Sequence, residues 1–353
     1  MKNYKILINN ETYEKAISYM ENLKTGSSAG KYLQKKLNNV DILQITPVKF
    51  FELLIGTKIP QIFAESSVYG DGTDWNQNEL SILGDINIAV PVTVFDNGKH
   101  HAPSIQKIPF KATLLFTPGA LLRNGRNNIP ADWEEVTVNG KINSETYYRL
   151  YERRLLPLFM YADEVAGSRG RTAFITVPGL GCGQFAGEFR GRLGSELKKT
   201  LKFFLKNHSS DFLKVRAVYY DPYRECENER HEINGTSFLV RPLTKGNENK
   251  SQLCIPKDYG EYVNEFADCE LFSLVAWDHV SWPGNDFYTG SRSTDDGVKA
   301  AATDAMYLLT GIEGKYDISS NRYNPPSEYK NWQEVVFRNK IRIEVKENFI
   351  VYP

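Results

Sequence analysis

The alternation of strand-like and helix-like segments from about residue 83 onward most constrains how this chain can fold. Segments rich in β-branched and aromatic residues, as strands are, lie at 86–95, 111–122, the start of 172–189, 213–223, 235–242 and 270–282. Segments with apolar residues at helical spacing lie at 144–167, 190–208 and 297–309. Strands separated by helices pair in parallel within layered sheets. The sequence therefore predicts an α/β fold with a layered sheet.

The first 80 residues have a different character. Helical spacing recurs at 11–23 and 49–56, and polar, glycine-containing turns follow these segments. We expect a helical N-terminal region over residues 1–80, which packs on or precedes a domain over 81–353 and serves in packing or partner recognition. The segment 100–109 is expected to be a loop, and the last residues, 337–353, are expected to add an edge strand.

The charge balance excludes some classes of partner. Lys plus Arg and Asp plus Glu number 43 each, so no net field draws the chain to nucleic acid or to an anionic membrane, and we expect neither partner. No apolar run approaches the roughly 18 residues of a membrane span. The first residues mix charged and apolar positions, and no signal peptide is recognised there. A cytoplasmic-type protein is expected.

The cysteines and histidines are too few and too dispersed for two common kinds of site. Four cysteines lie far apart without a CxxC pair, beside only five histidines. This pattern argues against a structural zinc site and a disulfide scaffold, and we expect neither a metal nor a cofactor. Cys182 has no nucleophile-elbow pattern around it and no predicted base beside it, so we expect a small buried thiol rather than a catalytic one.

A glycine-rich segment joins the strand that begins at 172 to the helix at 190–208. Its glycines are Gly179, Gly181, Gly183 and Gly187. Without side chains, backbone N–H groups can approach an anion, and the start of the next helix adds positive potential. The pattern predicts a phosphate or diphosphate site, with an ordinary tight turn as the alternative. It lacks the Walker GK[ST] ending and misses the dinucleotide spacing.

Acidic residues gather between the strand at 270–282 and the next helix. They are Asp278, Asp286, Asp295 and Asp296. One or two of them are expected to be turn and capping residues. The same stretch holds large aromatic residues, which need something to pack against in a polar turn: Trp277, Trp282, Phe287 and Tyr288. A ligand with an apolar face and hydroxyl groups would satisfy both kinds of residue.

Both segments are expected to leave the carboxyl ends of strands, where ligands bind in open α/β sheets. A diphosphate site beside a carboxylate-rich loop suggests a nucleoside diphosphate that carries a sugar. Carboxylates near the anomeric carbon can orient water, accept its proton and stabilise an oxocarbenium-like transition state. By the same topological argument Tyr220 or Asp221, at the end of the strand in 213–223, is expected to hold the nucleoside end, with a purely structural role as the alternative.

These two segments resemble macrodomain ADP-ribose hydrolases. GLGCGQFAGEF, residues 179–189, resembles the diphosphate loop of poly(ADP-ribose) glycohydrolases, in which a phenylalanine packs on the ligand; Phe185 matches it. VAWDHVSWPGNDFYTGSRSTDDG, residues 275–297, is similar to the catalytic loop of the bacterial effector macrodomain hydrolases typified by Legionella MavL, a family that removes ADP-ribose from modified ubiquitin. The acidic positions of that loop match Asp278, Asp286 and Asp296. The resemblance covers about residues 165–310.

The resemblance implies a three-layer, macrodomain-like mixed sheet flanked by helices, which binds ADP-ribose and hydrolyses its bond to a protein side chain. Arginine is the expected acceptor, ubiquitin the suspected protein, and delivery into a host cell the alternative to a cytoplasmic location. The expected catalytic residues are Asp286 and Asp296, with Asp278 shaping the loop. From all these lines of reasoning, the expected ligand-binding residues are Gly179, Gly181, Cys182, Gly183, Gln184, Phe185, Ala186, Gly187, Trp282, Asn285, Tyr220 and Asp221.

Three other functions fit parts of the sequence. A non-catalytic ADP-ribose reader would use the same residues, with the acids only accepting hydrogen bonds. A dinucleotide-dependent oxidoreductase would use Asp221 as its ribose-binding acid, but about 40 residues separate it from Gly181, against the usual 20 or so. A metal-assisted hydrolase would hold magnesium through the aspartates, which lack the regular spacing of a calcium loop.

Overall fold

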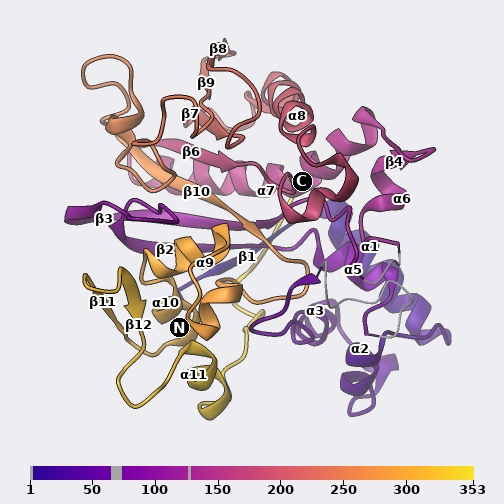
Figure 1. The fold of residues 1–353 in the computed structure, drawn as a ribbon. Coiled ribbons are helices and arrows are strands. Elements are labelled where there is room, and N and C mark those ends of the chain that lie inside the picture. The colour runs from indigo at the N-terminus through magenta and orange to yellow at the C-terminus, as the bar shows by residue number, and fades with distance from the viewer. Residues whose placement is uncertain (1–2, 65–73, 126–128) are drawn as a thin grey trace.

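The structure is a computed structural model that describes residues 3–64, 74–125 and 129–353. Nine strands of the described chain form one sheet through its centre, in the order β13-β1-β2-β3-β10-β6-β7-β9-β8 (Figure 1). Their bounds are β1 Lys5–Asn9, β2 Asn87–Asp96, β3 Ile105–Pro118, β6 Thr172–Pro178, β7 Val215–Asp221, β8 Glu229–Ile233, β9 Thr236–Val240, β10 Cys269–Trp277 and β13 Phe349–Tyr352. β3, β10, β6, β7 and β9 run parallel, whereas β2 and β8 run antiparallel to their neighbours. The sheet is therefore mixed, as the resemblance implies.

Helices cover both faces of this sheet and make three layers (Figure 1). Along β1, Ile6 and Ile8 belong to the core shared with α1, α3 and α5, whereas Leu7 belongs to the core shared with α7 and α8. Successive side chains of a strand point to opposite faces, so the sheet separates two hydrophobic cores. The helices of these layers are α1 Asn10–Lys24, α2 Lys31–Leu37, α3 Pro47–Ile55, α5 Gln77–Leu83, α7 Ser144–Ser168 and α8 Leu193–His208. The predicted three-layer α/β class is confirmed.

A third, smaller core lies outside the sheet. It combines residues of α9, α10 and α11, with Trp332 among those of α11, and also contains Phe287 and Tyr288. The remaining elements are α6 Trp133–Val136, β4 Thr137–Val138, β5 Lys141–Ile142, α9 Asp295–Ala301, α10 Ala305–Thr310, β11 Lys315–Asp317, β12 Arg322–Asn324, α11 Trp332–Arg338 and the 3-10 turns Ile42–Gln44, Gln184–Phe189, Pro256–Tyr259 and Asn285–Thr289. This core packs the segments that follow β10 against the rest of the molecule.

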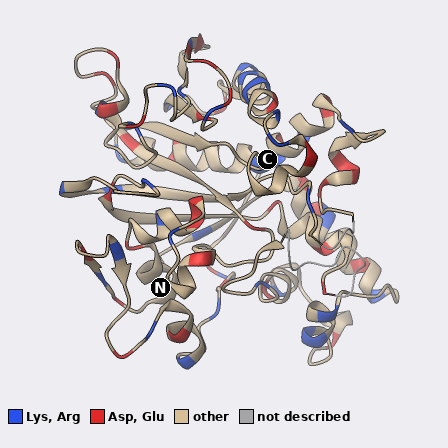
Figure 2. Cartoon of the chain, viewed as in Figure 1, with Lys and Arg blue, Asp and Glu red and all other residues tan. Residues whose placement is uncertain are grey.

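Charged side chains are distributed over the whole chain. Figure 2 shows Lys and Arg interspersed with Asp and Glu rather than separated into oppositely charged halves, in keeping with the zero net charge. Within the described residues, no helix combines the length and the apolar character that a membrane crossing requires.

Two predicted boundaries differ from the structure. β3 begins at Ile105, inside the segment expected to be a loop, because it pairs with β2 as far as Asp96. The helix predicted over 297–309 is divided into α9 and α10. β1 pairs with β2 only up to Ala89, so the rest of that edge of β2 is not paired with β1. Residues 302–304 bond to this part of β2, where the N–H of Phe95 donates to the carbonyl of Ala302 at 2.9 Å. That pairing interrupts the helix.

The N-terminal region contributes a strand that sequence analysis missed. β1 lies inside the sheet, where Ile6 pairs with Ile88 of β2 on one side and with Phe349 of β13 on the other. The expected C-terminal edge strand is present as β13. The division of the chain at residue 80 stays a prediction, and β1 supplies the means to test it.

Replacing Ile6 by alanine should lower the stability of the whole chain. Ile6 is fully buried between the sheet and the N-terminal helices, and such truncations cost about 2–5 kcal/mol. We expect one cooperative urea transition, seen alike by tryptophan fluorescence and far-ultraviolet circular dichroism, to move to lower urea. Leu213→Ala, at a residue that is 82% exposed, should leave it within about 0.5 kcal/mol. Two separate transitions, only one of which moves, would instead support independent units.

Candidate functional site

Four parallel strands end side by side at one edge of the sheet. β3, β10, β6 and β7 are neighbours in that order, and their last residues are Pro118, Trp277, Pro178 and Asp221. The glycine loop, residues 179–189, follows β6, and the acid loop, residues 278–296, follows β10. The ring centroids of Phe185 and His279, one from each loop, lie 6.1 Å apart. The two predicted segments therefore meet at the carboxyl edge, where open α/β sheets bind ligands.

The loops that follow β3 and β6 touch across the end of β10, which lies between them. A Cβ atom on Gly119 would lie only 2.2 Å from the backbone nitrogen of Gly181, so no side chain fits there. Gly181 itself has a φ of +70°, which glycine adopts without strain. The N–H of Leu122 donates to the carbonyl of Phe185 at 2.8 Å. Close backbone approach, rather than the turn alone, requires glycine at these two positions.

The outer side of the glycine loop has free backbone donors. Among the described residues, nothing accepts a hydrogen bond from the N–H groups of Gly183, Gln184 or Phe185. Gly183 and Gln184 are exposed, and a Cβ atom added to Gly183 would meet no atom within 4 Å. The side chain of Gln184 accepts from Arg123 at 2.8 Å. Adjacent N–H groups without an acceptor are what an anion site requires, and the assignment to a diphosphate stays a prediction.

The other residues of the glycine loop have structural contacts. The N–H of Cys182 donates to the carbonyl of Gly179 at 3.0 Å, and burial raises the pKa of the Cys182 thiol. A neutral thiol is a poor nucleophile. Ala186 is buried in the core shared with α7 and α8. A Cβ atom on Gly187, where φ is +54°, would lie 2.7 Å from the carbonyl oxygen of Leu122, so this glycine also permits close packing.

Two carboxylates fold the acid loop on itself. Asp286 accepts hydrogen bonds from the hydroxyl of Thr294 at 2.7 Å and from its N–H at 3.1 Å. Asp296, in the first turn of α9, accepts from the N–H groups of Gly284 at 2.6 Å and Asn285 at 3.0 Å. Both aspartates are buried, and burial raises the pKa of Asp296 well above its usual range. Each carboxylate therefore closes one turn of the loop.

The N-terminal region is bonded directly to the acid loop. The N–H of Ile62 donates to Oδ1 of Asn285 at 2.9 Å, and the N–H of Ala64 donates to Oδ2 of Asp278 at 2.8 Å. Asp278 and Asn285, both expected at the ligand, thus serve as anchors for the segment before residue 65. This role was not apparent from the sequence, because the two partners are more than two hundred residues away along the chain.

A buried lysine that sequence analysis did not single out lies against the acid loop. The Nζ of Lys58 lies 4.2 Å from the ring centroid of Trp277 and donates to the carbonyl of His279. The carbonyl of Lys58 accepts from the indole N–H of Trp282 at 3.1 Å. Burial lowers the pKa of Lys58 to about 7, although Asp278 acts in the opposite direction. Lys58 therefore brings a cation that titrates near neutral pH beside one of the predicted acids.

The aromatic residues of the acid loop pack on protein. Trp282, Phe287 and Tyr288 are buried in the third core, with Trp332 of α11. The rings of Trp282 and Tyr288 meet edge to face, with centroids 6.1 Å apart. The sequence argument assigned these rings to a ligand because their partner helix lies far along the chain. Trp282 is not thereby excluded from ligand contact, and its assignment stays a prediction.

A network of buried charges joins this edge of the sheet to α7. Arg154 donates from Nε to Asp85 at 3.0 Å and from Nη2 to Asp132 at 2.7 Å. Asp132, from the segment after β3, also lies 3.1 Å from Nε2 of His279 in the acid loop. Arg153 pairs with the other oxygen of Asp85 at 2.6 Å. The network therefore connects loops that the strand order alone would leave independent.

These contacts fix the ionisation of the network. Burial alone would raise the pKa of Asp132, but Arg154 and His279 hold it well below its usual range. Burial lowers the pKa of His279. Asp132 raises this pKa, but by less than burial lowers it. A neutral His279 that donates from Nε2 to Asp132 leaves Nδ1 as an acceptor, and Nδ1 has no hydrogen-bond partner among the described residues. His279 thus presents an unused acceptor between the two loops.

Other unpartnered polar atoms gather at the same edge. Buried side-chain atoms with no hydrogen-bond partner among the described residues include Thr117 Oγ1 and Trp277 Nε1 at the strand ends, and His279 Nδ1 and Ser281 Oγ in the acid loop. Folded proteins leave few such atoms, and each calls for a partner from water or a ligand. These atoms agree with the predicted ligand site at this edge, which stays a prediction.

Tyr220 and Asp221, at the end of β7, have structural contacts of their own. The buried Tyr220 hydroxyl donates to the carbonyl of Gly194 at 2.8 Å. Asp221 accepts from the N–H groups of Tyr223 and Leu243, both at 2.8 Å, and burial raises its pKa. Contact of either side chain with a nucleoside stays a prediction.

The donor set does not point to a resident metal. Among the described residues, no three His, Cys, Asp or Glu side chains are arranged to hold an ion. Asp278, Asp286 and Asp296 use their oxygens on backbone N–H groups instead. The site as described is built from backbone donors, carboxylates and one neutral imidazole.

Comparison with known proteins identifies a family. The family model described as macrodomain effector MavL matches residues 4–329. This range includes β1, the N-terminal helices, the glycine loop and the acid loop, and it is wider than the resemblance recognised from the two loops. A search of curated proteins found no match.

Removing the central cation of the buried network should destabilise the fold. Arg154→Met leaves the buried carboxylate of Asp132 without a cation, with only the imidazole of His279 and the N–H of Leu121 as partners, and breaking such a pair costs about 3–5 kcal/mol. Arg149→Met is the matched control on the same helix, because Arg149 pairs with Glu145 on the exposed surface and should cost less than about 1 kcal/mol. Urea unfolding measures both, and equal losses would show that the network does not support the edge of the sheet.

Proposed function

The chain belongs to the MavL family of macrodomain effectors, and we propose that it is an ADP-ribosyl hydrolase that releases mono-ADP-ribose from a modified protein side chain. Family membership indicates an ADP-ribose-related function. The observation that carries the finer proposal is the meeting of the glycine loop with the acid loop, marked by the contact of Phe185 with His279. One loop offers donors for a diphosphate, and the other offers carboxylates next to it.

In this proposal the diphosphate binds to the backbone N–H groups of the glycine loop. The support is that the N–H groups of Gly183, Gln184 and Phe185 have no acceptor among the described residues, and that the space above Gly183 is open. Phe185, half-buried beside His279, would pack on the ribose that follows the diphosphate. This placement puts the same ribose, at the distal end of the ligand, next to the acid loop.

Asp286 and Asp296 are the proposed catalytic residues, and Asp278 shapes the loop. A carboxylate offers about four acceptor positions. Asp296 uses two on Gly284 and Asn285, which leaves capacity for a ribose hydroxyl or for water. Water would add to the anomeric carbon as the bond to the protein side chain breaks, and the proton lost by water would pass to a carboxylate. The backbone contacts fix both acids in place before the ligand binds.

The acceptor side chain and the protein are taken from the resemblance alone. We propose arginine as the modified side chain and ubiquitin as the protein, with action inside a host cell as an effector. The coarser inference, that the protein binds ADP-ribose, follows from the family. Release of ADP-ribose from arginine-modified and from glutamate-modified peptides would separate the possible linkages.

A non-catalytic reader is the second candidate, and one observation favours it. Asp278, Asp286 and Asp296 each accept hydrogen bonds from the backbone of the loops around them. Acids used in this way can hold a binding loop in shape without doing chemistry. A reader would bind ADP-ribose tightly and release none from any modified protein.

Side chains introduced at Gly183 should block ADP-ribose. A Cβ atom added to this glycine meets no protein atom within 4 Å but occupies the proposed diphosphate position. We expect titration calorimetry to show weaker binding for Gly183→Ala and none for Gly183→Val, with thermal unfolding unchanged. Gly187 is a poorer choice because its Cβ would press on Leu122. Wild-type affinity in a folded Gly183→Val protein would contradict the placement.

Replacing the proposed catalytic acids should abolish turnover with little effect on binding. Asp286→Asn and Asp296→Asn should each slow release of ADP-ribose from an arginine-modified protein by about 10²–10⁴-fold. Asp295→Asn is the matched control, because Asp295 also accepts a backbone N–H, from Ala276 at 2.8 Å, but is not a proposed catalyst. The two effects to measure are the release rate and the ADP-ribose affinity.

Three outcomes of that experiment are distinct. Slow release with normal affinity in the two variants alone supports the hydrolase. An equal loss in Asp295→Asn would mean that the acids only shape the loop. Tight ADP-ribose binding by a wild-type protein that releases nothing from any linkage would replace the hydrolase with the reader.

A further inference from the structure

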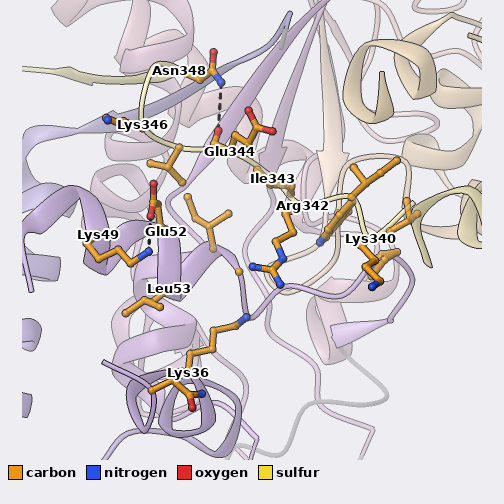
Figure 3. Close-up of a pocket in the computed structure, with 18 of the residues that line it drawn as sticks. Lys36, Lys49, Glu52, Leu53, Lys340, Arg342, Ile343, Glu344, Lys346 and Asn348 are labelled. Carbon is orange, nitrogen blue, oxygen red and sulfur yellow. Dashed lines mark hydrogen bonds and ion pairs between the residues drawn. The ribbon is translucent and has the colours of Figure 1, made fainter. Parts of the chain in front are cut away.

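A cavity of about 950 Å³ lies between the N-terminal helices and the C-terminal segment 336–348. One wall comes from the end of α2 and from α3, and the other from 336–348 (Figure 3). Pro60 and Trp282 also line the cavity, so it adjoins the back of the acid loop, but neither the glycine loop nor the proposed catalytic acids line it. Ligand sites usually enclose about 300–1,000 Å³. The cavity is thus a second candidate site, separate from that of the proposed function.

Two cations approach each other across this cavity. Figure 3 shows Lys36, from α2, and Arg342, from the opposite wall, extending toward one another. Burial lowers the pKa of Lys36, and the nearby charge of Arg342 lowers it further. Among the described residues neither cation forms an ion pair, whereas Lys49 in the same cavity is paired with Glu52 at 2.9 Å. Glu344 and Glu347 also line the cavity, and among the described residues neither forms an ion pair with Lys36 or Arg342.

The positive charge of Lys36 and Arg342 indicates which class of anion would bind between them. Lys36 reaches Gly56 at the end of α3, where the helix carbonyls contribute about half a negative charge. These carbonyls offset part of the charge of Lys36, and Arg342 keeps its full positive charge. A carboxylate carries one negative charge, whereas a phosphate monoester carries about −1.5 to −2 at pH 7. A phosphate monoester matches the pair more closely than a carboxylate does.

The rest of the cavity is suited to an apolar group. Leu53, Ile343 and Trp282 line it, and Phe337 at its rim is 61% exposed. A large exposed aromatic ring beside cations offers a face for an apolar or aromatic ligand. Three further lysines lie around the cavity and add positive potential without a carboxylate partner among the described residues: Lys35, Lys340 and Lys346.

We propose that this cavity binds a phosphate monoester carried on an apolar body, with Lys36 and Arg342 holding the phosphate from opposite walls. Soluble aromatic monophosphates and the lipid phosphatidic acid share this chemistry. The ligand would bridge the N-terminal helices and the C-terminal segment. It would also lie against Trp282, whose indole N–H is bonded to Lys58 beneath the acid loop.

Titration calorimetry with phenyl phosphate tests this directly. Because the two cations hold the phosphate from different walls, Lys36→Gln and Arg342→Gln should each weaken binding by on the order of tenfold or more. Lys107→Gln makes the same change at an exposed lysine that does not line the cavity, and it should bind as the wild type does. ADP-ribose affinity and thermal unfolding should be unchanged in all three variants, which separates this site from the proposed function.

Sedimentation with vesicles distinguishes the two sources of the ligand. Vesicles of phosphatidylcholine with phosphatidic acid are compared with vesicles that carry phosphatidylserine. Binding to phosphatidic acid that is lost in both variants supports the proposal with a lipid ligand, and binding of phenyl phosphate alone supports it with a soluble one. The proposal is overturned if neither probe binds the wild type, or if both variants bind as tightly as the wild type. Tighter binding of a hexaglutamate peptide than of phenyl phosphate would also overturn it.

Discussion

The candidate site depends on Arg154, a buried arginine that holds three separate parts of the chain at the carboxyl edge of the sheet. It bonds to Asp85 before β2, to Asp132 after β3 and, through Asp132, to His279 after β10. Taking such charges out of water costs several kcal/mol per ion, so the network is favourable only when each member keeps its partner. Loss of any one member therefore leaves a buried charge without its partner. The acid loop is held in position by this network through His279.

The two loops differ in whether their backbone N–H groups have hydrogen-bond acceptors within the protein. In the described part of the chain, three successive backbone N–H groups of the glycine loop have no acceptor, whereas the acid loop uses its carboxylates to satisfy its own backbone. An anion can therefore bind the first loop without displacing any internal hydrogen bond. A sugar at the second loop would use the acceptor positions that remain on the acids, or Nδ1 of His279, which has no partner among the described residues.

The sequence predicted the features that depend on local pattern and missed those that depend on distant partners. Alternation of strands and helices placed the glycine and acid loops at the same edge, because short connections in α/β sheets leave few arrangements. β1 was missed because five residues directly before a helix carry little periodicity. Arg154 looks like one of many charged positions on an amphipathic helix, and only the fold shows that it faces Asp85 and Asp132. The sequence predicted that Trp282 and its neighbours pack on a ligand, whereas in the structure they pack against α11.

The central claim is that ADP-ribose spans both loops, and amide chemical shifts of isotope-labelled protein test it most directly. ADP should shift the resonances of Gly183, Gln184 and Phe185, because it supplies the diphosphate. ADP-ribose should shift these and also the amides of Gly284 and Asn285, which bond to Asp296 in the acid loop. Shifts confined to the glycine loop with ADP-ribose, or absent from it with both ligands, would contradict the account.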